Sequence, residues 1–294
     1  MTGEITALLD VVVVSHNSAA HLDACLTSIA AQVDGAGAGV VGDVVVVDNA
    51  SSDRSAAVVA GYPLVRWVAT GSNLGFGGGA NRGVAAAAAH PYVAILNPDV
   101  IVDPHCLAQL VNELERRPHL GAVGPNVLNL DGSVYPSART FPSLIDAAGH
   151  ALLGSIVPGN RFTKRYVGIG QPDWISGTAM VVRRAAFEQV GGFDEAYFMY
   201  VEDVDLCWRW RQAGWRVDRV QSAALHHAIG GSSEAAPFVM IVAHHRSLWR
   251  FARRSTAGAK RLLLPVIGMG LVVRMGLVTA RRVVLHRPPA TQHR

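Results

Sequence analysis

The chain has 294 residues; half are apolar and only 16% are charged, which excludes a disordered protein and allows a sizeable core. The formal net charge of +4 is modest, and we expect no nucleic-acid partner. Three widely spaced cysteines form no CxxC pair, so they exclude a disulfide framework or a zinc site and indicate a reducing compartment.

The first half of the chain alternates between strand and helix patterns. Residues 11–15 (VVVVS) form a short continuous apolar run, as expected of a parallel strand buried on both faces. We interpret this run as the first strand and not as a signal peptide, because no basic region precedes it. Further strands are predicted over 41–50, 64–70 and 92–100, and helices over 19–33, from 51 onwards, and after a glycine-rich turn near 75. This alternation predicts an α/β fold with a doubly wound, mostly parallel sheet.

Polar residues follow the end of each predicted strand. The clusters are Ser15-His16-Asn17, Asp48-Asn49, Gly71-Ser72-Asn73 and Asn97-Pro98-Asp99. Ligands of open α/β sheets bind beyond the carboxyl ends of the strands. Four such clusters therefore predict a pocket of nucleotide size.

The segment NLGFGGGANRG (73–83) contains three consecutive glycines, which we expect in a loop before a helix. Backbone N–H groups there could approach a diphosphate at the helix N-terminus. The segment is not a P-loop, and it is not a Rossmann fingerprint because it follows the third strand. A tight turn without a ligand is the alternative.

Asp99 is the candidate metal ligand, because hard divalent cations prefer oxygen ligands. The alternative is an Asn-Pro turn in which Asp99 caps a helix. A neutral imidazole from the pair His226-His227 could complete the metal's coordination sphere. The pattern leaves the choice between the two histidines open.

The alternation weakens after residue 124. We expect a loop over 125–143, rich in Pro and Ser, and then a second apolar segment over 174–184. No repeat or low-complexity linker interrupts the chain. Residues 1–245 are therefore predicted to be one domain, followed by an arginine-rich C-terminal segment.

The segment FMYVEDVDLCWRW (198–210) places carboxylates inside an apolar helix pattern predicted over 201–213. At 100° per residue, Asp203 shares the core-facing stripe, Asp205 lies opposite and can pair with Arg209 in water, and Glu202 lies at the edge. The helix dipole alone explains acids at the positions of Glu202 and Asp205. An inward carboxylate that opens on a pocket is suited to general-base catalysis, so Asp203 is the candidate base.

Residues 246–294 form a basic segment that contains many arginines and no acidic residue. Its longest apolar run, 262–273, has twelve residues before Arg274, too few to span a bilayer as a helix. An amphipathic helix at an anionic membrane surface fits this pattern. The alternative is a C-terminal helix packed on the domain, and the sequence does not decide whether 262–285 is one helix or two pieces.

Taken together, the motifs resemble glycosyltransferase family 2, which has the GT-A fold. The resemblance covers about 10–250 and includes, in family order, VVVVSHNS, VVDNASSDRS, NLGFGGGANRG, LNPDV, SGTAMVVRR, GGFDEAYFMYVEDVDLCWRWRQAG and HHxxGGSS. It implies an inverting glycosyltransferase with a nucleotide-sugar-binding half (1–124) and an acceptor-binding and catalytic half (125–245). In this enzyme Asp203 is the base and Glu202 the rival base. NPD replaces the commoner Asp-x-Asp, which leaves one carboxylate for the metal.

The resemblance also implies roles for matched residues. The nucleotide base would be held by Asp48 and the segment around His16 and Asn17, and the donor diphosphate and sugar by Gly75, Phe76, Asn81 and Arg82; Ser15, Asn73 and Asn97 complete the predicted nucleotide-sugar site. Asp99 would bind Mg²⁺ or Mn²⁺, with His227 favoured over His226. Trp174, Ser176 and Gly177 would approach the sugar and the acceptor.

The stretch PSART (136–140) after DGSVY is similar to bacterial rhamnosyltransferases. More narrowly, it resembles actinobacterial enzymes that add L-rhamnose to N-acetylglucosaminyl-diphospho-decaprenol, the linker of peptidoglycan to arabinogalactan. The resemblance implies a dTDP-L-rhamnose donor, a polyprenyl-diphosphate-linked sugar acceptor, and a cytoplasmic enzyme attached peripherally to the inner face of the plasma membrane. An oligomer is compatible with it. The alternatives are a UDP-hexose or UDP-galactofuranose donor, or a non-catalytic nucleotide-sugar-binding scaffold.

Overall fold

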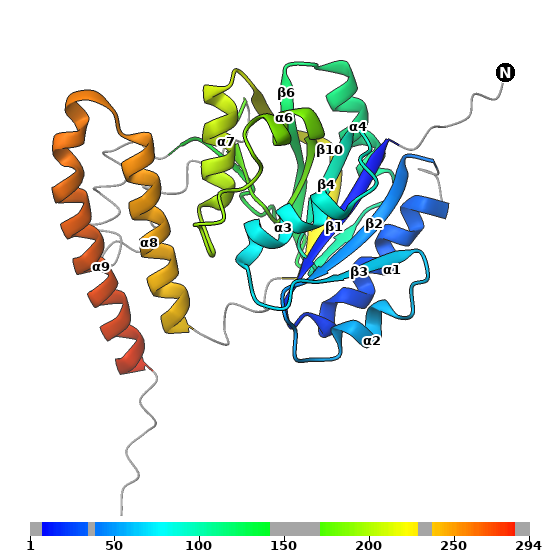
Figure 1. Ribbon diagram of the computed structural model, residues 1–294, viewed down its shortest axis with the longest axis horizontal. Helices are drawn as coiled ribbons and strands as arrows, with labels where there is room; N and C mark the ends of the chain where they lie inside the picture. The colour runs from blue at the N-terminus through cyan, green and yellow to red at the C-terminus, as the bar shows by residue number, and fades with distance from the viewer. Residues whose placement is uncertain (1–7, 35–38, 142–170, 229–236, 286–294) are drawn as a thin grey trace, which may run out of the picture. The chain divides into compact units, whose positions relative to one another are not determined.

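The structure is a computed structural model that describes residues 8–34, 39–141, 171–228 and 237–285 (Figure 1). The chain divides into two compact units, 1–141 with 166–234, and 142–165 with 235–294. Helix α8 (Pro237–Ser255) runs through residue 245 without a break, and the domain boundary expected there stays a prediction. The glycine turn expected at 229–233, the end of the 125–143 segment and the last residues of the chain lie outside the described residues.

An eight-stranded sheet forms the centre of the first unit, in the order β3-β2-β1-β4-β9-β6-β10-β5. The strands are β1 (Leu9–Ser15), β2 (Val41–Asp48), β3 (Val65–Ala69), β4 (Tyr92–Leu96), β5 (Val100–Val102), β6 (Leu120–Asn129), β9 (Ala179–Arg183) and β10 (Arg216–His227). The β1–β2, β1–β4, β2–β3 and β6–β10 pairs are parallel, whereas β9 and β5 run antiparallel to their neighbours. The predicted mostly parallel α/β sheet is confirmed.

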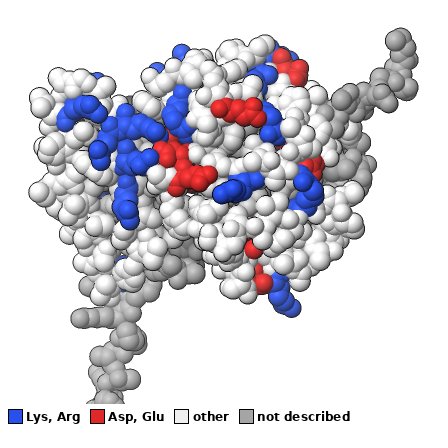
Figure 2. Space-filling model, in the orientation of Figure 1, with Lys and Arg blue, Asp and Glu red and all other residues white. Residues whose placement is uncertain are grey.

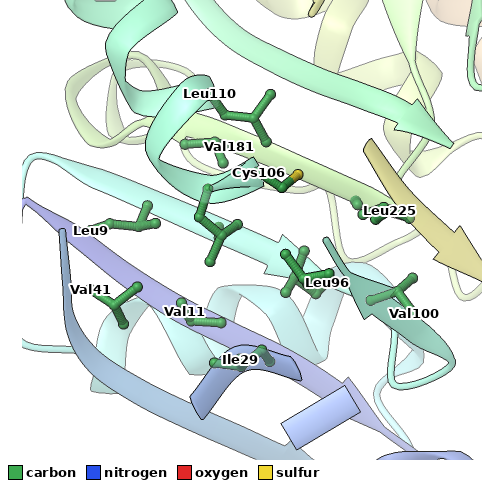
Figure 3. Close-up of a cluster of buried hydrophobic side chains, with 14 of the residues drawn as sticks. Leu9, Val11, Ile29, Val41, Leu96, Val100, Cys106, Leu110, Val181 and Leu225 are labelled. Atoms are coloured by element: carbon green, nitrogen blue, oxygen red, sulfur yellow. The ribbon is translucent and has the colours of Figure 1, made fainter. Parts of the chain in front are cut away.

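Helices cover both faces of this sheet. One face packs against α1 (Ala19–Asp34), α2 (Ser55–Val59) and α4 (Cys106–Arg116), and the other against α3 (Gly75–Ala86), α6 (Arg184–Gln189) and α7 (Glu202–Gln212). Side chains of β1 alternate between the two layers, with Val11 and Val13 in the core shown in Figure 3 and Val12 and Val14 in the other. Because a strand's side chains point alternately to the two faces, only a strand covered on both sides can be apolar throughout.

The glycines of 73–83 lie inside a helix, so the predicted loop is wrong. Helix α3 begins at Gly75, and a Cβ added at Gly79 would lie 2.7 Å from a methyl carbon of Val14. At Gly83 the added Cβ would lie 2.2 Å from Val12. The glycines therefore allow α3 to pack directly on β1, and this packing outweighs their low helix propensity.

The region after residue 124 is more regular than predicted. Strand β6 continues to Asn129 through Pro125, and β10 was not expected as a strand. Pro125 lies beyond the two β6 residues that pair with β9, and its partner Val220 borders a register shift in β10. Proline is tolerated where a ladder hydrogen bond is already missing.

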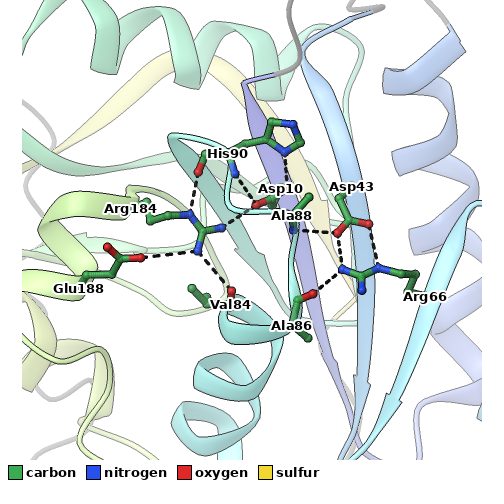
Figure 4. Close-up of polar contacts among 9 residues, drawn as sticks. All are labelled: Asp10, Asp43, Arg66, Val84, Ala86, Ala88, His90, Arg184 and Glu188. Carbon is green, nitrogen blue, oxygen red and sulfur yellow. Dashed lines mark hydrogen bonds and ion pairs between the residues drawn. The ribbon is translucent and has the colours of Figure 1, made fainter.

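A buried ion-pair network closes the amino-terminal edge of the sheet (Figure 4). Asp10 on β1 is 0% exposed, and its Oδ1 lies 2.6 Å from Nδ1 of His90. Its Oδ2 accepts hydrogen bonds from the Arg184 guanidinium at 2.6 Å and from the His90 backbone N–H at 3.1 Å. Arg184 also donates to the carbonyl oxygens of His90 and Val84. Every charged group of this network therefore has partners.

The second unit contains α8, a 3₁₀ turn (Gly258–Leu263) and α9 (Leu264–Leu285), and Figure 2 shows basic side chains gathered on this hairpin. Helix α9 is continuous because Pro265 lies in its first turn, where a proline N–H would be unpaired anyway. By length and composition alone, Gly258–Val283 could cross a membrane. The twelve-residue limit expected from the sequence is therefore wrong.

Arg274 does not interrupt the apolar surface of α9. Its guanidinium lies 3.3 Å from Nε2 of His245 on α8, so it points toward the partner helix. The α8–α9 contact also includes Gly268, whose hydrogen faces the Trp249 ring. Ile267 and Leu271 on α9 are buried.

Candidate active site

The strand register places the predicted polar clusters along one edge of the sheet. Ser15 pairs with Asp48, Asp48 with Ala69, and Val13 with Leu96. The residues that follow β1, β2, β3 and β4 therefore lie side by side, as expected from the sequence. The antiparallel strand β9 adds its beginning to this edge, because Leu96 pairs with Ala179 and the Asn97 N–H donates to the Thr178 carbonyl oxygen.

The first part of the site is a tightly bonded turn region next to β1 and β2. Both carboxylate oxygens of Asp48 accept the Ser51 N–H, and the His16 ring Nδ1 lies 2.8 Å from the Asn49 carbonyl oxygen. Asn17 has a φ of 50° and accepts the Ser52 N–H at 2.8 Å. The buried hydroxyl of Ser15 has no partner among the described residues.

Helix α3 begins beside this region. Its N-terminal Gly75 has a φ of 74°, and a Cβ there would lie 1.9 Å from the Phe198 carbonyl oxygen, so only glycine fits. The Gly75 N–H donates to Asn73 Oδ1. Phe76 packs against Gly177, which brings α3 next to the start of β9.

Two other predicted donor-binding residues on α3 differ in their surroundings. Asn81 uses its amide group to donate to the Phe193 carbonyl oxygen and to Glu195 Oε1, and its Oδ1 accepts the Phe193 N–H. Asn81 therefore ties α3 to the segment that leads to α7. Arg82 is exposed. Their contacts with a donor stay predictions.

Asp99 and His227 form the polar pair nearest to a metal site. Asp99 Oδ2 lies 3.2 Å from His227 Nε2, and the Ala228 N–H donates to the Asp99 carbonyl oxygen. Asp99 Oδ1 and His227 Nδ1 are buried without a partner among the described residues. His226 instead faces Asp103 at 3.5 Å. The structure thus brings His227, and not His226, to Asp99.

This pair offers only two protein ligands. Within the described part of the chain, no group of three or more His, Cys, Asp or Glu side chains is arranged to hold a metal ion. The buried, unpaired oxygen of Asp99 fits a hard cation whose remaining ligands are phosphate and water. Asn97, which fills the place of a second carboxylate, has its carbonyl oxygen 3.8 Å from the Cys25 sulfur.

Helix α7 presents the acidic residues, after two residues in a strained conformation. Tyr200 and Val201 have φ values of 66° and 70°, in the left-handed region that β-branched residues rarely adopt. Asp203 Oδ2 accepts the Gly177 N–H at 3.0 Å, and Oδ1 accepts the Val204 N–H at 2.8 Å. Burial raises the pKa of Asp203, and these hydrogen bonds partly offset that rise. Strain of this kind is typical of functional sites.

Glu202 is more deeply buried than the sequence indicates. Its side chain is 7% exposed instead of lying at the edge, and Oε2 has no partner among the described residues. Burial, followed by the charge of Asp203, raises the pKa of Glu202 to about 8. Both effects favour the protonated form of Glu202.

The predicted exposure of Asp205 is wrong, although its predicted partner is right. Asp205 is 0% exposed and accepts hydrogen bonds from Arg209 Nε at 2.7 Å and from the Tyr197 hydroxyl at 3.1 Å. Arg209 also donates to the Val190 carbonyl oxygen. A helical wheel takes account of one helix alone. In the structure the 190–197 segment folds over this face of α7 and covers Asp205.

Two further residues, Tyr135 and Arg139, lie near the acids, and the sequence analysis gave them no role. Burial raises the pKa of Tyr135, the charge of Arg139 lowers it, and the charges of Asp203 and Asp99 raise it. The Tyr135 ring therefore lies within electrostatic range of both carboxylates, and its centroid is 5.5 Å from that of His227. Both residues fall within or next to the PSART stretch, the one signal that pointed to them.

The three predicted acceptor residues lie on or just after the short strand β8 (Trp174–Ile175), which pairs with β7 (Ala138–Arg139). The Trp174 indole N–H donates to the Thr140 carbonyl oxygen, and the Ser176 hydroxyl lies 2.9 Å from that of Thr178. Gly177 links this ribbon to Asp203. The structure thus brings the predicted acceptor residues to the predicted base.

Comparisons with known families agree with this fold. The family model of glycosyl transferase family 2 matches residues 10–191, and that of the N-terminal domain of galactosyltransferase matches residues 170–229. Among solved structures, the mannosyltransferase PcManGT from Pyrobaculum calidifontis, in complex with GDP-Man and Mn²⁺, is 17% identical with a TM-score of 0.58; the match covers 94% of this chain and 76% of that one. At this identity the likeness supports the GT-A fold alone.

Two curated relatives are closer in sequence. The N-acetylglucosaminyl-diphospho-decaprenol L-rhamnosyltransferase of Mycobacterium tuberculosis is 39% identical over 269 residues, 84% of each chain. The rhamnosyltransferase WbbL of Escherichia coli K12 is 31% identical over 196 residues, 63% of this chain and 72% of that one.

Proposed function

The chain belongs to glycosyltransferase family 2, and from that premise we propose that it transfers L-rhamnose from dTDP-L-rhamnose to N-acetylglucosamine linked to a polyprenyl diphosphate. The observation that carries this proposal is the 39% identity to the mycobacterial rhamnosyltransferase over 84% of both chains. The convergence of the strand-end clusters and the acidic helix on one edge supports a transferase site. The product would be part of a cell-wall linker to arabinogalactan.

The chemistry we propose is a single inverting displacement. An acceptor hydroxyl oxygen attacks the anomeric carbon of rhamnose, the bond from that carbon to the β-phosphate oxygen breaks, and dTDP leaves. Asp203 takes the proton of the hydroxyl. Attack from the face opposite the leaving group inverts the anomeric centre, and a positioned general base contributes about 10²- to 10⁴-fold to the rate.

The two adjacent carboxylates favour Asp203 as this base. A general base must reach its substrate, and the Glu202 side chain is only 7% exposed. Burial raises the pKa of Asp203 as well, but the N–H groups of Gly177 and Val204 and the charge of Arg139 lower it. Asp203 is only half-buried and its oxygens are oriented by two backbone N–H groups. A neutral Glu202 also avoids a second negative charge beside the base.

Asp99 and His227 would hold a divalent cation, Mg²⁺ or Mn²⁺, together with the donor diphosphate. The buried, unpaired Oδ1 of Asp99 and the 3.2 Å approach of His227 to its Oδ2 support this assignment. A bound cation supplies positive charge that stabilises the departing diphosphate. The remaining donor contacts that we propose are those of Ser15, His16, Asn17, Asp48, Asn73, Gly75, Phe76, Asn81, Arg82 and Asn97.

The second unit would dock the enzyme on the cytoplasmic face of the plasma membrane. Val266, Met269 and Val273 follow helical spacing on α9 and are 64%, 66% and 50% exposed. Lys260 and Arg261 precede this apolar stripe in the sequence, and Arg281 and Arg282 follow it. Such a helix inserts its apolar side at the interface while Lys and Arg meet anionic headgroups.

Vesicle flotation tests this docking. Full-length protein should float with vesicles that contain anionic phospholipid, and the double variant Met269→Asp/Val273→Asp should stay in solution. The control is Leu64→Asp, which changes a side chain that is 75% exposed in the first unit and should float normally. Flotation of the double variant, or retention of the wild type in membranes after carbonate extraction, would contradict peripheral docking.

The donor and acceptor are tested by product analysis. Purified protein is incubated with N-acetylglucosaminyl-diphospho-polyprenol as the acceptor and one of three donors: dTDP-L-rhamnose, a UDP-hexose or UDP-galactofuranose. The mass of the lipid product is then measured by mass spectrometry. We expect addition of one deoxyhexose from dTDP-L-rhamnose and none from the UDP sugars. A product formed from a UDP sugar alone would keep the enzyme class and refute the donor. Tight nucleotide-sugar binding without any product would favour a scaffold.

A further inference from the structure

The β7–β8 ribbon presents a polar face beside the candidate base. Ala138 and Ile175, which pair with each other, are 1% exposed and face the core. Because side chains alternate along a strand, Arg139 and Trp174 lie on the other face. The Gly177 N–H just beyond β8 donates to Asp203. The ribbon thus holds Arg139 on the Asp203 side of the site.

The guanidinium of Arg139 is held in place by its Nε, while its two terminal nitrogens keep their hydrogen-bonding capacity. Its Nε donates to the Pro136 carbonyl oxygen at 2.8 Å, and Cζ lies 5.4 Å from the centre of the Trp174 ring. Neither terminal nitrogen donates a hydrogen bond to any residue in the described part of the chain. No carboxylate within that part forms a salt bridge with it either. Two oriented donors on a fixed cation are therefore available to a ligand.

We propose that the terminal nitrogens of Arg139 bind a phosphate oxygen of the acceptor's diphosphate. Arginine donates two parallel hydrogen bonds to phosphate, and its stacking on an aromatic ring leaves this edge open. Trp174 then acts as a positioning residue for Arg139, in addition to any contact it makes with the acceptor. The assignment rests on the proposed function, because it assumes an acceptor that carries a diphosphate.

The position of Arg139 favours the acceptor's diphosphate over that of the donor. The donor diphosphate is assigned to Asp99, directly before β5, and to His227 at the end of β10, which face each other. Arg139 instead lies on the ribbon that contacts Asp203, the group that meets the acceptor hydroxyl. The positive charge also helps to keep Asp203 deprotonated, since it lowers a pKa that burial raises.

Binding of farnesyl diphosphate, a prenyl diphosphate without a sugar, tests the proposal on the full chain. The measurement is made by calorimetry with saturating dTDP and Mg²⁺, so that the donor's phosphate site is occupied. We expect Arg139→Ala to weaken binding about 10- to 100-fold, as for loss of a charge-assisted pair of hydrogen bonds. Arg139→Lys keeps the charge but loses the pair of parallel donors, so its affinity for farnesyl diphosphate should lie between those of the wild type and Arg139→Ala. The control Arg116→Ala removes a side chain that is 80% exposed on α4 and should bind as the wild type does.

Each outcome bears on the proposal. Equal farnesyl diphosphate affinity in the wild type and Arg139→Ala would overturn it, and so would a lowered thermal midpoint as the only effect of the variant. Weaker binding of dTDP to Arg139→Ala, with farnesyl diphosphate unaffected, would assign the arginine to the donor. The wild type could transfer no rhamnose while Arg139→Ala still binds farnesyl diphosphate more weakly than the wild type. That result would refute the proposed donor and support the phosphate site.

Discussion

Two clusters of carboxylates lie at opposite ends of the parallel strands, and they differ in how their oxygens are satisfied. At the amino-terminal end, Asp10 is fully buried and both of its oxygens have charged or N–H partners. At the carboxyl-terminal end, Asp99 and Glu202 each bury an oxygen that has no partner among the described residues. A buried polar group without a partner costs free energy. The first cluster therefore stabilises the fold, and the second keeps capacity for ligands and protons.

Asp203→Asn should produce the largest change in activity. Asparagine keeps the shape and can still accept the Gly177 N–H, but it cannot take a proton. We expect the transfer rate to fall about 10²- to 10⁴-fold, with dTDP-L-rhamnose affinity nearly unchanged in a titration. An equal loss of donor affinity and turnover would make Asp203 a binding or structural residue.

Asp10→Ala should produce the largest change in stability. It leaves the charge of Arg184 buried without its partner, and breaking such a pair costs about 3–5 kcal/mol of unfolding free energy. Denaturant titration measures this loss, and the activity of the remaining folded protein should stay normal. The double variant Asp10→Leu/Arg184→Met removes both charges and should recover much of the loss. A single variant as stable as the wild type would refute the structural role.

His227→Gln should weaken the response to metal. Loss of one of the two protein ligands is expected to raise the Mn²⁺ concentration needed for half-maximal transfer roughly tenfold or more. His226→Gln is the matched control, because His226 faces Asp103 and not Asp99. The reverse result, with His226→Gln as the more sensitive variant, would contradict the assignment.

Glu202→Gln should have the smallest effect on transfer, and an effect on stability that depends on pH. The pKa of Glu202 is raised to about 8 in the folded protein, whereas an unfolded Glu titrates near ~4.3. Between these values the unfolded chain releases a proton that the folded protein keeps, so wild-type stability falls as pH rises. Glu202→Gln has no titrating group at this position, so its stability should not fall with pH in this way.

The thermal midpoint of Glu202→Gln should therefore exceed that of the wild type increasingly from about pH 5 to pH 8. The difference should be small at the acidic end, where both proteins have a neutral group at this position. Transfer at neutral pH should stay within about tenfold of the wild-type rate. Loss of transfer comparable to that of Asp203→Asn would make Glu202 the base.

Much of the sheet could be predicted because its strands are buried on both faces. The continuous valine runs of β1 and β2 and the polar residues after them indicated parallel strands and their common edge. Periodicity could not place the glycines of α3 in a helix, since their use depends on contact with Val12 and Val14 of a strand far away in the sequence. Tertiary packing overrides local propensity at such positions.

In the candidate site, too, local sequence patterns predicted some features, whereas others depend on tertiary packing. Asp99 was found from its position after an apolar strand, Asp203 from its place on the core-facing stripe of a helix, and the histidines from their pairing before a glycine turn. The burial of Asp205 depends on the 190–197 segment that covers it, which no single element reveals. The resemblance favoured His227 over His226, and it is His227 that lies beside Asp99. Arg139 was missed because its role depends on a two-residue strand pair between distant segments.

The most direct test measures both transfer rate and unfolding free energy on Asp203→Asn and Asp10→Asn prepared side by side. We predict that Asp203→Asn folds at least as stably as the wild type and transfers almost no rhamnose. Asp10→Asn should be clearly less stable, yet transfer at the normal rate per folded molecule. Comparable losses of stability in both variants, or normal transfer by Asp203→Asn, would contradict the assignment of catalysis to the carboxyl-terminal edge.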